Sequence, residues 1–200
     1  NDYQQGIVTP IVGATVSFRH NGSSVRSDSQ GYFTLSNLTA GTQVLDINAA
    51  TAQDSPVGGP YAGFREQYPL IAHVENHEAR PFYLPRIDRD SLTQIDPAIE
   101  TRVANPNLGV SFTVPPYTAK NPDGSYFTGQ FSISEVPRNL APAAMPETID
   151  PGLLVTIQPV GITFTEPVAL TFPNIDHLEP GNEVDIWSVD PEMGAFVIVG

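Results

Sequence analysis

The sequence predicts an all-β protein made of two tandem β-sandwich domains with little helix. Twenty prolines and 16 glycines punctuate a chain that is 40% hydrophobic but only 16% charged, a composition typical of many short strands joined by turns. Apolar and polar residues alternate with a period of two in several runs, and no long stretch combines a helical apolar period with an absence of proline and glycine. A chain of 200 residues is long enough to fill two modest cores.

The first predicted domain covers residues 1–86. Residues 14–18 alternate apolar and polar side chains, and Asn21-Gly22 follows, a dipeptide that favours a type I′ hairpin because both central residues need a positive φ. A spacing of about 8 to 12 residues between strands is typical of a sandwich. Further strands are expected at residues 25–27, 32–35, 44–49, 68–74 and 81–84.

Three motifs follow one another in this half of the chain. They are Gly13-Ala14-Thr15-Val16, then Ser27-Asp28-Ser29-Gln30-Gly31-Tyr32-Phe33-Thr34-Leu35, then Asn37-Leu38-Thr39-Ala40-Gly41-Thr42. This order resembles the signature of the carboxypeptidase regulatory-like family, which implies a transthyretin-like (prealbumin-like) sandwich over about residues 5–85. The resemblance implies a fold and no particular function, because this fold serves as a spacer, stabiliser or adhesive module in many proteins.

The second predicted domain covers residues 87–200. We expect it to be truncated at its C-terminus, because the chain stops on an apparent strand at residues 195–199, as an excised fragment would. Further strands are expected at residues 110–114, 129–136, 153–158, 168–172 and 183–189.

Three stretches of this half resemble the β-sandwich of zonula-occludens proteins and netrin receptors. They are residues 109–116, residues 158–173 and Trp187-Ser188-Val189-Asp190, before Gly194-Ala195-Phe196. Some members of that family cleave themselves at a His-Phe-Ser step, and since that tripeptide does not occur here, self-cleavage is not implied. The order of the two domains also resembles segments of large bacterial surface proteins related to teneurins.

Charge and cysteine content exclude several classes of protein. The chain has 22 acidic residues against 9 basic ones, and Lys120 is its only lysine, whereas nucleic-acid surfaces need clustered basic side chains. The absence of cysteine removes disulfides, thiolate catalysis and cysteine-based metal sites. No apolar run approaches about 18 residues, so no membrane insertion is predicted. The acidic, lysine-poor composition suits calcium-rich surroundings and favours an extracellular or cell-surface location.

A long loop is predicted at residues 50–69, where glycine, proline and alanine are frequent. A loop of this length inside a compact domain is usually functional or mobile. Its candidate ligand-binding residues are Tyr61, Phe64, Arg65 and Tyr68. Packing of the aromatic side chains across the edge of the sandwich is the alternative, and it is the favoured one.

One candidate metal site is His73-Val74-Glu75-Asn76-His77. On a strand, His73, Glu75 and His77 would share one face, so two imidazoles and a carboxylate would converge on a cation such as zinc. Alternation of polar residues on an exposed strand explains the same pattern without a metal, and this is the favoured interpretation.

A second candidate metal site lies at the predicted junction of the domains. Asp88, Asp90 and Asp96 offer oxygen ligands there, and calcium commonly rigidifies such junctions in extracellular proteins. The spacing matches no defined calcium loop, and pairing with arginines such as Arg86 and Arg89 is the alternative. The sequence therefore leaves calcium open as a cofactor.

The predicted function is that of a non-catalytic structural or adhesive module in a large secreted or cell-surface protein. The sequence contains no Gly-x-Ser-x-Gly, no phosphate-binding glycine-rich loop and no His-Glu-x-x-His, so we do not expect an enzyme. The expected partners are neighbouring domains of the same polypeptide, with another protein or a glycan as further partners. The alternative is a carbohydrate- or ligand-binding module that uses the aromatic residues of the loop at residues 50–69.

Overall fold

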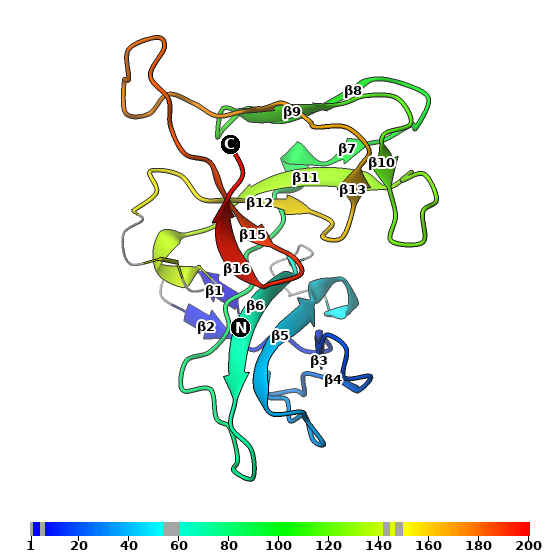
Figure 1. The fold of residues 1–200 in the computed structure, drawn as a ribbon, viewed down its shortest axis with the longest axis vertical. Coiled ribbons are helices and arrows are strands. Elements are labelled where there is room, and N and C mark those ends of the chain that lie inside the picture. Colours follow the sequence, from blue (N-terminus) through cyan, green and yellow to red (C-terminus); the bar gives the residue numbers. More distant parts are fainter. Residues whose placement is uncertain (1, 5–6, 54–60, 142–144, 147–149) are drawn as a thin grey trace. The chain divides into compact units, whose positions relative to one another are not determined.

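A computed structural model describes residues 2–4, 7–53, 61–141, 145–146 and 150–200 (Figure 1). Every sheet in it is antiparallel. Over the described ranges the only helices are three short 3-10 turns, η1 (Ala49–Thr51), η2 (Arg89–Ser91) and η3 (Arg138–Leu140). The predicted all-β class with little helix is therefore confirmed.

The chain divides into two compact units. Unit 1 comprises Asn1–Arg86, Asn139–Asp150 and Glu183–Gly200, and unit 2 comprises Ile87–Arg138 and Pro151–Asn182. Along the chain, the first boundary between unit 1 and unit 2 lies between Arg86 and Ile87. The segment Glu183–Gly200, which the sequence assigns to the second domain, groups with unit 1. The limits of the two domains as folding units stay a prediction.

Unit 1 is built on one four-stranded sheet in the order β4-β3-β5-β6. The strands are β3 (Thr15–Phe18), β4 (Ser24–Arg26), β5 (Gly41–Asn48) and β6 (Phe64–Leu70). The predicted hairpin between β3 and β4 is confirmed, with Val16 opposite Val25. Its positive φ angles fall at His20 and Gly22 rather than at both residues of the predicted Asn21-Gly22 pair.

The core of unit 1 lies on one face of this sheet. Val16, Phe18, Leu45 and Ile47 are buried there, as the period-two pattern of a half-buried strand predicts. Burial of each such side chain stabilises the fold by about 1.5 to 3 kcal/mol.

Two segments that the sequence predicts as strands cover this core without joining a ladder. Residues 32–35 and 81–84 are in no strand, although Phe33 and Phe82 stack with ring centroids 6.3 Å apart and pack against the core. The prediction of strands there is wrong because alternation specifies which side chains face the core, whereas a ladder also needs a neighbouring backbone in register.

The prediction of a loop at residues 50–69 is also wrong for the second half of that segment. Phe64–Leu70 forms β6, which pairs along its whole length with β5, and the strand predicted at residues 68–74 ends at Leu70. Residues 54–60 of the predicted loop lie outside the described residues. The glycine and proline content of the segment favours a loop. Pro69 nevertheless fits in β6, because it lies close to the end of an edge strand, where a missing backbone N–H is tolerated.

Two hairpins complete unit 1. β1 (Asp2–Gln4) pairs with β2 (Ile7–Thr9), and β15 (Trp187–Asp190) pairs with β16 (Ala195–Ile198). The tip of the second hairpin meets β6, where the Gln67 N–H donates to the Gly194 carbonyl at 2.9 Å. A Cβ atom on Gly194, which has a φ of 65°, would lie 2.6 Å from the Gln67 nitrogen, so this contact requires glycine.

Unit 2 holds three small sheets, in the orders β14-β9-β8, β12-β11-β7 and β10-β13. Strands expected from the sequence at residues 110–114, 129–136 and 153–158 are confirmed by β9, β11 and β12, and the one at residues 168–172 is reduced to the two-residue β14. The elements are β7 (Thr93–Gln94), β8 (Thr101–Asn105), β9 (Val110–Val114), β10 (Ala119–Lys120), β11 (Gln130–Glu135), β12 (Val155–Gln158), β13 (Thr163–Phe164) and β14 (Leu170–Thr171).

Aromatic rings fill the core of unit 2. Phe131 is buried and lies between three other phenylalanines, with centroid distances of 4.8 Å to Phe127, 5.4 Å to Phe112 and 5.9 Å to Phe164. Edge-to-face and offset arrangements of this kind stabilise a core beyond the area that they bury. No helix in the described part of the chain has the length and apolarity needed to cross a membrane.

Candidate functional site

The aromatic residues predicted to bind a ligand do not form an exposed cluster. Tyr61 and Phe64 are buried in the core of unit 1, and Phe64 is the first residue of β6. Arg65 is half-buried and pairs with Asp46 across β5 and β6, with its Nε 2.6 Å from Asp46 Oδ2. Packing, the favoured alternative for these aromatic side chains, therefore describes where Tyr61 and Phe64 lie.

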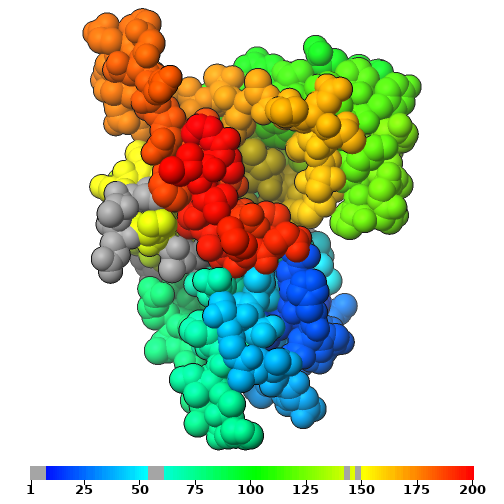
Figure 2. Space-filling view, in the orientation of Figure 1, coloured from blue at the N-terminus to red at the C-terminus, as the bar shows by residue number. Residues whose placement is uncertain are grey.

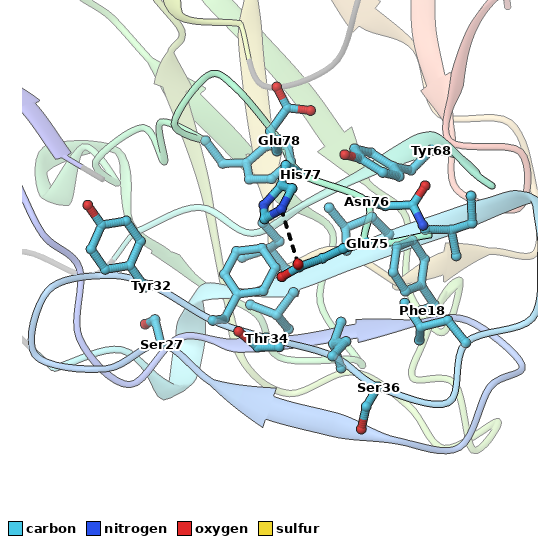
Figure 3. A pocket seen from close by; sticks show the side chains of 18 of the residues that line it. Phe18, Ser27, Tyr32, Thr34, Ser36, Tyr68, Glu75, Asn76, His77 and Glu78 are labelled. Atoms are coloured by element: carbon cyan, nitrogen blue, oxygen red, sulfur yellow. Dashed lines mark ion pairs between the residues drawn. The ribbon is translucent and has the colours of Figure 1, made fainter. Parts of the chain in front are cut away.

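Tyr68, in contrast, lines a cavity. The cavity has a volume of about 1040 Å³ and lies within unit 1, partly open to solvent (Figure 3). Its floor includes Phe18 and Leu45 from the sheet, and Phe33 and Phe82 line it from the covering segments. A space of this size and apolar character falls in the range of small-molecule sites.

Burial raises the pKa of the Tyr68 phenol above its ordinary value of 10.0, and Glu78 raises it further by its negative charge and a hydrogen bond. Both effects favour the neutral phenol. Residues 71–80 form one side of the cavity, and Figure 3 shows Tyr68 and Glu78 on that side.

The candidate zinc residues occupy this same segment, but they do not lie on a strand. Residues 71–80 are exposed and project from unit 1 (Figure 2), and His73 sits in a turn with a φ of 60°. The Asn76 amide bonds the N–H and the carbonyl of Ile71, which bends the chain. The predicted strand geometry is therefore wrong.

Only two members of the candidate zinc set meet. His77 Nε2 lies 3.5 Å from Glu75 Oε2, and both side chains are largely exposed. Over the ranges that the structure describes, no three side chains of His, Cys, Asp or Glu are grouped to hold a metal ion. Zinc usually takes at least three protein ligands, and this arrangement does not supply them.

Two of the three candidate calcium residues at the junction, Asp88 and Asp96, act as hydrogen-bond acceptors. Asp88 Oδ1 accepts the Asp90 N–H at 3.0 Å as the N-cap of η2, and Asp88 Oδ2 accepts from Asn105 Nδ2 at 2.8 Å. Asp96 Oδ1 accepts the Ala98 N–H at 2.9 Å. The backbone and Asn105 thus bond three of these oxygens, as is usual for aspartates that start turns.

A surface of unit 2 that the sequence did not point to carries two exposed tyrosines and the only lysine. Tyr117 and Tyr126 are 54% and 45% exposed, and their rings are 5.3 Å apart at 65°. The Nζ atom of Lys120 lies 3.2 Å from the centroid of the Tyr126 ring, a cation–π contact. We refer to Tyr117, Lys120 and Tyr126 together as the tyrosine–lysine surface.

The backbone holds these three residues in place. Lys120 pairs with Thr163 of β13 and forms an isolated bridge with Tyr126. Tyr117 has a φ of 61°, a left-handed conformation that is unusual for a bulky side chain, and its N–H donates to the Pro97 carbonyl at 2.7 Å.

The turn between Lys120 and Tyr126 is closed by an aspartate. Hydrogen bonds from the Ser125 hydroxyl and N–H, at 2.6 and 2.9 Å from Asp123 Oδ1, lower the pKa of the Asp123 carboxyl. Gly124 completes the turn with a φ of 83°. Proline, aspartate and glycine all favour turns, so the sequence Asn121-Pro122-Asp123-Gly124 accounts for this geometry.

Residues 100–189 match the family model of the ZU5 domain. The ZU5 match covers less than half of the chain and runs from the start of β8 into β15. It supports in part the resemblance found for the second half of the sequence. ZU5 domains are protein-interaction domains in larger multidomain proteins. Neither the curated proteins nor the solved structures gave a match to the chain.

The ZU5 match contains the whole tyrosine–lysine surface. One feature of the sequence points to this surface, namely that Lys120 is the only lysine of the chain. The proximity of the two tyrosines depends on the left-handed turn at Tyr117, which no periodic pattern predicts. The match does not reach the core of unit 1, whose transthyretin-like fold stays a prediction.

Proposed function

We propose that the chain is a non-catalytic structural and interaction module of a larger secreted or cell-surface protein. The observation that carries the proposal is the ZU5 match at residues 100–189, since this family is non-enzymatic and mediates protein–protein interactions. Unit 2 would supply the interaction, and unit 1 would space or support neighbouring domains of the same polypeptide.

Acidic side chains in both units have structural roles that fit this function. Asp88 caps η2 and bonds the buried Asn105, and Asp46 pairs with Arg65 inside the sheet of unit 1. A carboxylate that accepts hydrogen bonds from the backbone, an amide or an arginine fixes the chain locally. These contacts give the module a defined shape, which a spacer or docking domain requires.

The proposed extracellular or cell-surface location is supported by the amino-acid composition. A net charge of −13 and a single lysine favour solubility and disfavour binding to nucleic acid or anionic lipid. The resemblance of the first half to carboxypeptidase regulatory-like modules, and of the domain order to bacterial teneurin-related proteins, supports an adhesive or supporting role.

The test is a replacement in the parent protein. We expect that exchanging this chain for an unrelated β-sandwich of similar length abolishes assembly or surface display of the parent, while its synthesis continues. Surface labelling and size-exclusion chromatography of the parent would measure this. A parent that assembles and reaches the surface normally would contradict the proposal.

Ligand binding is a second candidate, favoured by the cavity of about 1040 Å³ in unit 1. Among the predicted ligand-binding residues Tyr68 is the one that lines it, because Tyr61 and Phe64 are core residues. Binding to a glycan array that is lost on Tyr68→Ala would support this function. Silence across a broad array would count against a carbohydrate ligand.

A further inference from the structure

We propose that the tyrosine–lysine surface is the docking site for a segment of a partner protein that presents a carboxylate beside an apolar side chain. This inference rests on the proposed interaction function of unit 2 and names the chemistry of the partner. It is carried by exposed aromatic area, by the placement of Lys120 and by the left-handed backbone at Tyr117.

Two segments that touch the tyrosine–lysine surface each carry an exposed aliphatic residue. The exposed Ile99 follows Pro97, whose carbonyl accepts the N–H of Tyr117, and the exposed Val160 adjoins Gly161. Gly161 faces Pro122 in the turn between Lys120 and Tyr126. Tyrosine is enriched at the centres of interfaces, where truncation of a single such residue often weakens binding strongly.

Lys120 sets the charge of the expected partner. It is the only lysine in a chain of net charge −13, and in the described residues its ammonium forms no ion pair. The ammonium has three donors, and its contact with the Tyr126 ring satisfies none of them as a hydrogen bond. A carboxylate is the complement of this group, and the ring already restricts the lysine side chain, which reduces the entropy lost on binding.

Backbone hydrogen bonds hold the tyrosine–lysine surface in one conformation in the absence of a partner. A left-handed tyrosine persists only where its surroundings hold it, and at Tyr117 the hydrogen bond to Pro97 does so. Thr118 Oγ1 adds a bond to the Pro115 carbonyl at 2.8 Å. Residues in such conformations occur preferentially at binding sites, where the fixed geometry serves recognition.

Two other occupants fit less well. A sugar ring stacks on an open, flat aromatic face, but the tyrosine rings meet at 65° and Lys120 covers one face of Tyr126. A second copy of the chain would bring together two molecules of net charge −13, which repel each other. A protein segment with an acidic residue next to an apolar one uses both the aromatic edges and the ammonium.

The first test compares short synthetic peptides bound to the whole chain. One peptide carries a central Glu between Leu and Tyr residues, and its matched control carries Gln in place of that Glu. We expect the Glu peptide to bind at least about tenfold more tightly than the Gln peptide, as one charge-assisted contact allows. Titration by NMR should move the signals of Tyr117, Tyr126 and Lys120.

Variants then locate the site. Tyr117→Asn keeps a residue that tolerates the left-handed conformation, and Lys120→Gln removes the charge. We expect each to weaken binding of the Glu peptide about tenfold or more, and Lys120→Arg to retain most of it. Tyr32→Ala, which removes an exposed tyrosine of unit 1, should leave binding unchanged. Circular dichroism checks the fold, and Tyr126→Ala replaces Tyr117→Asn if that variant unfolds.

Several outcomes overturn the inference. Equal binding of the Glu and Gln peptides, or undiminished binding to Lys120→Gln, would show that a carboxylate is not recognised here. Oligogalacturonate that shifts the Tyr117 and Tyr126 signals while the peptides do not would make this a glycan site. Dimerisation that Tyr117→Asn abolishes would make it a contact between copies. If replacing the whole chain blocks parent assembly but Tyr117→Asn does not, the proposed function stands and this inference fails.

Discussion

The two units bury similar kinds of side chain but pack them differently. In unit 2, Phe131 is enclosed by three other phenylalanine rings within 6 Å of its centroid. In unit 1, the face of the four-stranded sheet lies under a cavity of about 1040 Å³, and the segments that cover it form no ladder. Alternating sequence patterns occur in both units, so alternation alone does not produce a close-packed core.

The close packing of unit 2 and the cavity in unit 1 predict different responses to the truncation of core side chains. A side chain enclosed on all sides loses contacts and leaves a void when it is shortened, whereas one beside an existing cavity loses less. Unit 2 should therefore be sensitive to truncation of core residues, and unit 1 more tolerant.

Truncation of Phe131 should have the largest effect. Phe131→Ala removes a ring that contacts Phe112, Phe127 and Phe164, and we expect it to lower the free energy of unfolding by about 3 to 5 kcal/mol. Phe33→Ala is the matched change beside the cavity, and it should cost less than half as much. Urea denaturation of both variants measures this, and equal losses would refute the proposed difference between the units.

Removal of a buried amide in unit 2 should come next. Asn105 Nδ2 donates to Asp88 and to the Ile133 carbonyl, both at 2.8 Å, and the side chain is almost fully buried. Asn105→Ala leaves that carbonyl without its partner, so we expect a loss of about 2 to 3 kcal/mol. Denaturation should show it, with Asn107→Ala as the control, because Asn107 is exposed and contributes only its backbone N–H to Asn105.

The corresponding change in unit 1 should be smaller. Ser27 Oγ donates to the Ile11 carbonyl at 2.6 Å and accepts the Ala14 N–H at 3.1 Å. Ser27→Ala should cost about 1 to 2 kcal/mol, because these are neutral hydrogen bonds and the site lines the cavity. A loss that exceeds that of Asn105→Ala would show that the hydrogen bonds of unit 1 are as important as those of unit 2.

The smallest effect concerns ionisation at the cavity. The pKa of Tyr68 is raised by burial and then by Glu78, so the folded state holds its proton above the unfolded value of 10.0. The resulting contribution to stability is complete below about pH 10 and is lost as the pH rises through the folded pKa. In Glu78→Gln, NMR titration of the Tyr68 ring should give a lower pKa, whereas Glu75→Gln should leave it unchanged.

The fold class and several strands could be predicted from the sequence because local patterns carry them. Residues 14–18 and 110–114 alternate over the length of a strand and find antiparallel partners nearby in the fold. Residues 32–35 alternate equally well, yet they join no strand ladder in the described part of the chain. Pairing depends on which segments the fold brings into register, and this information is not local.

The candidate sites show the same limit. His73, Glu75 and His77 would share a face on a strand, but the Asn76 side chain bends the segment into a turn. The tyrosine–lysine surface escaped prediction because a left-handed residue and a two-residue strand bring its members together. Turn chemistry at Asp123-Gly124, in contrast, was predictable because aspartate and glycine determine it within a few residues.

The single lysine of this chain also has a practical consequence for identifying its partner. Reagents that acylate or crosslink side-chain amines can react here only at Lys120, which is part of the tyrosine–lysine surface. A zero-length crosslink from that amine to a carboxylate would therefore report the neighbour of this surface directly. A lysine-specific protease would cut the unfolded chain at this one position, so the rate of cleavage would report how often the backbone at this surface opens.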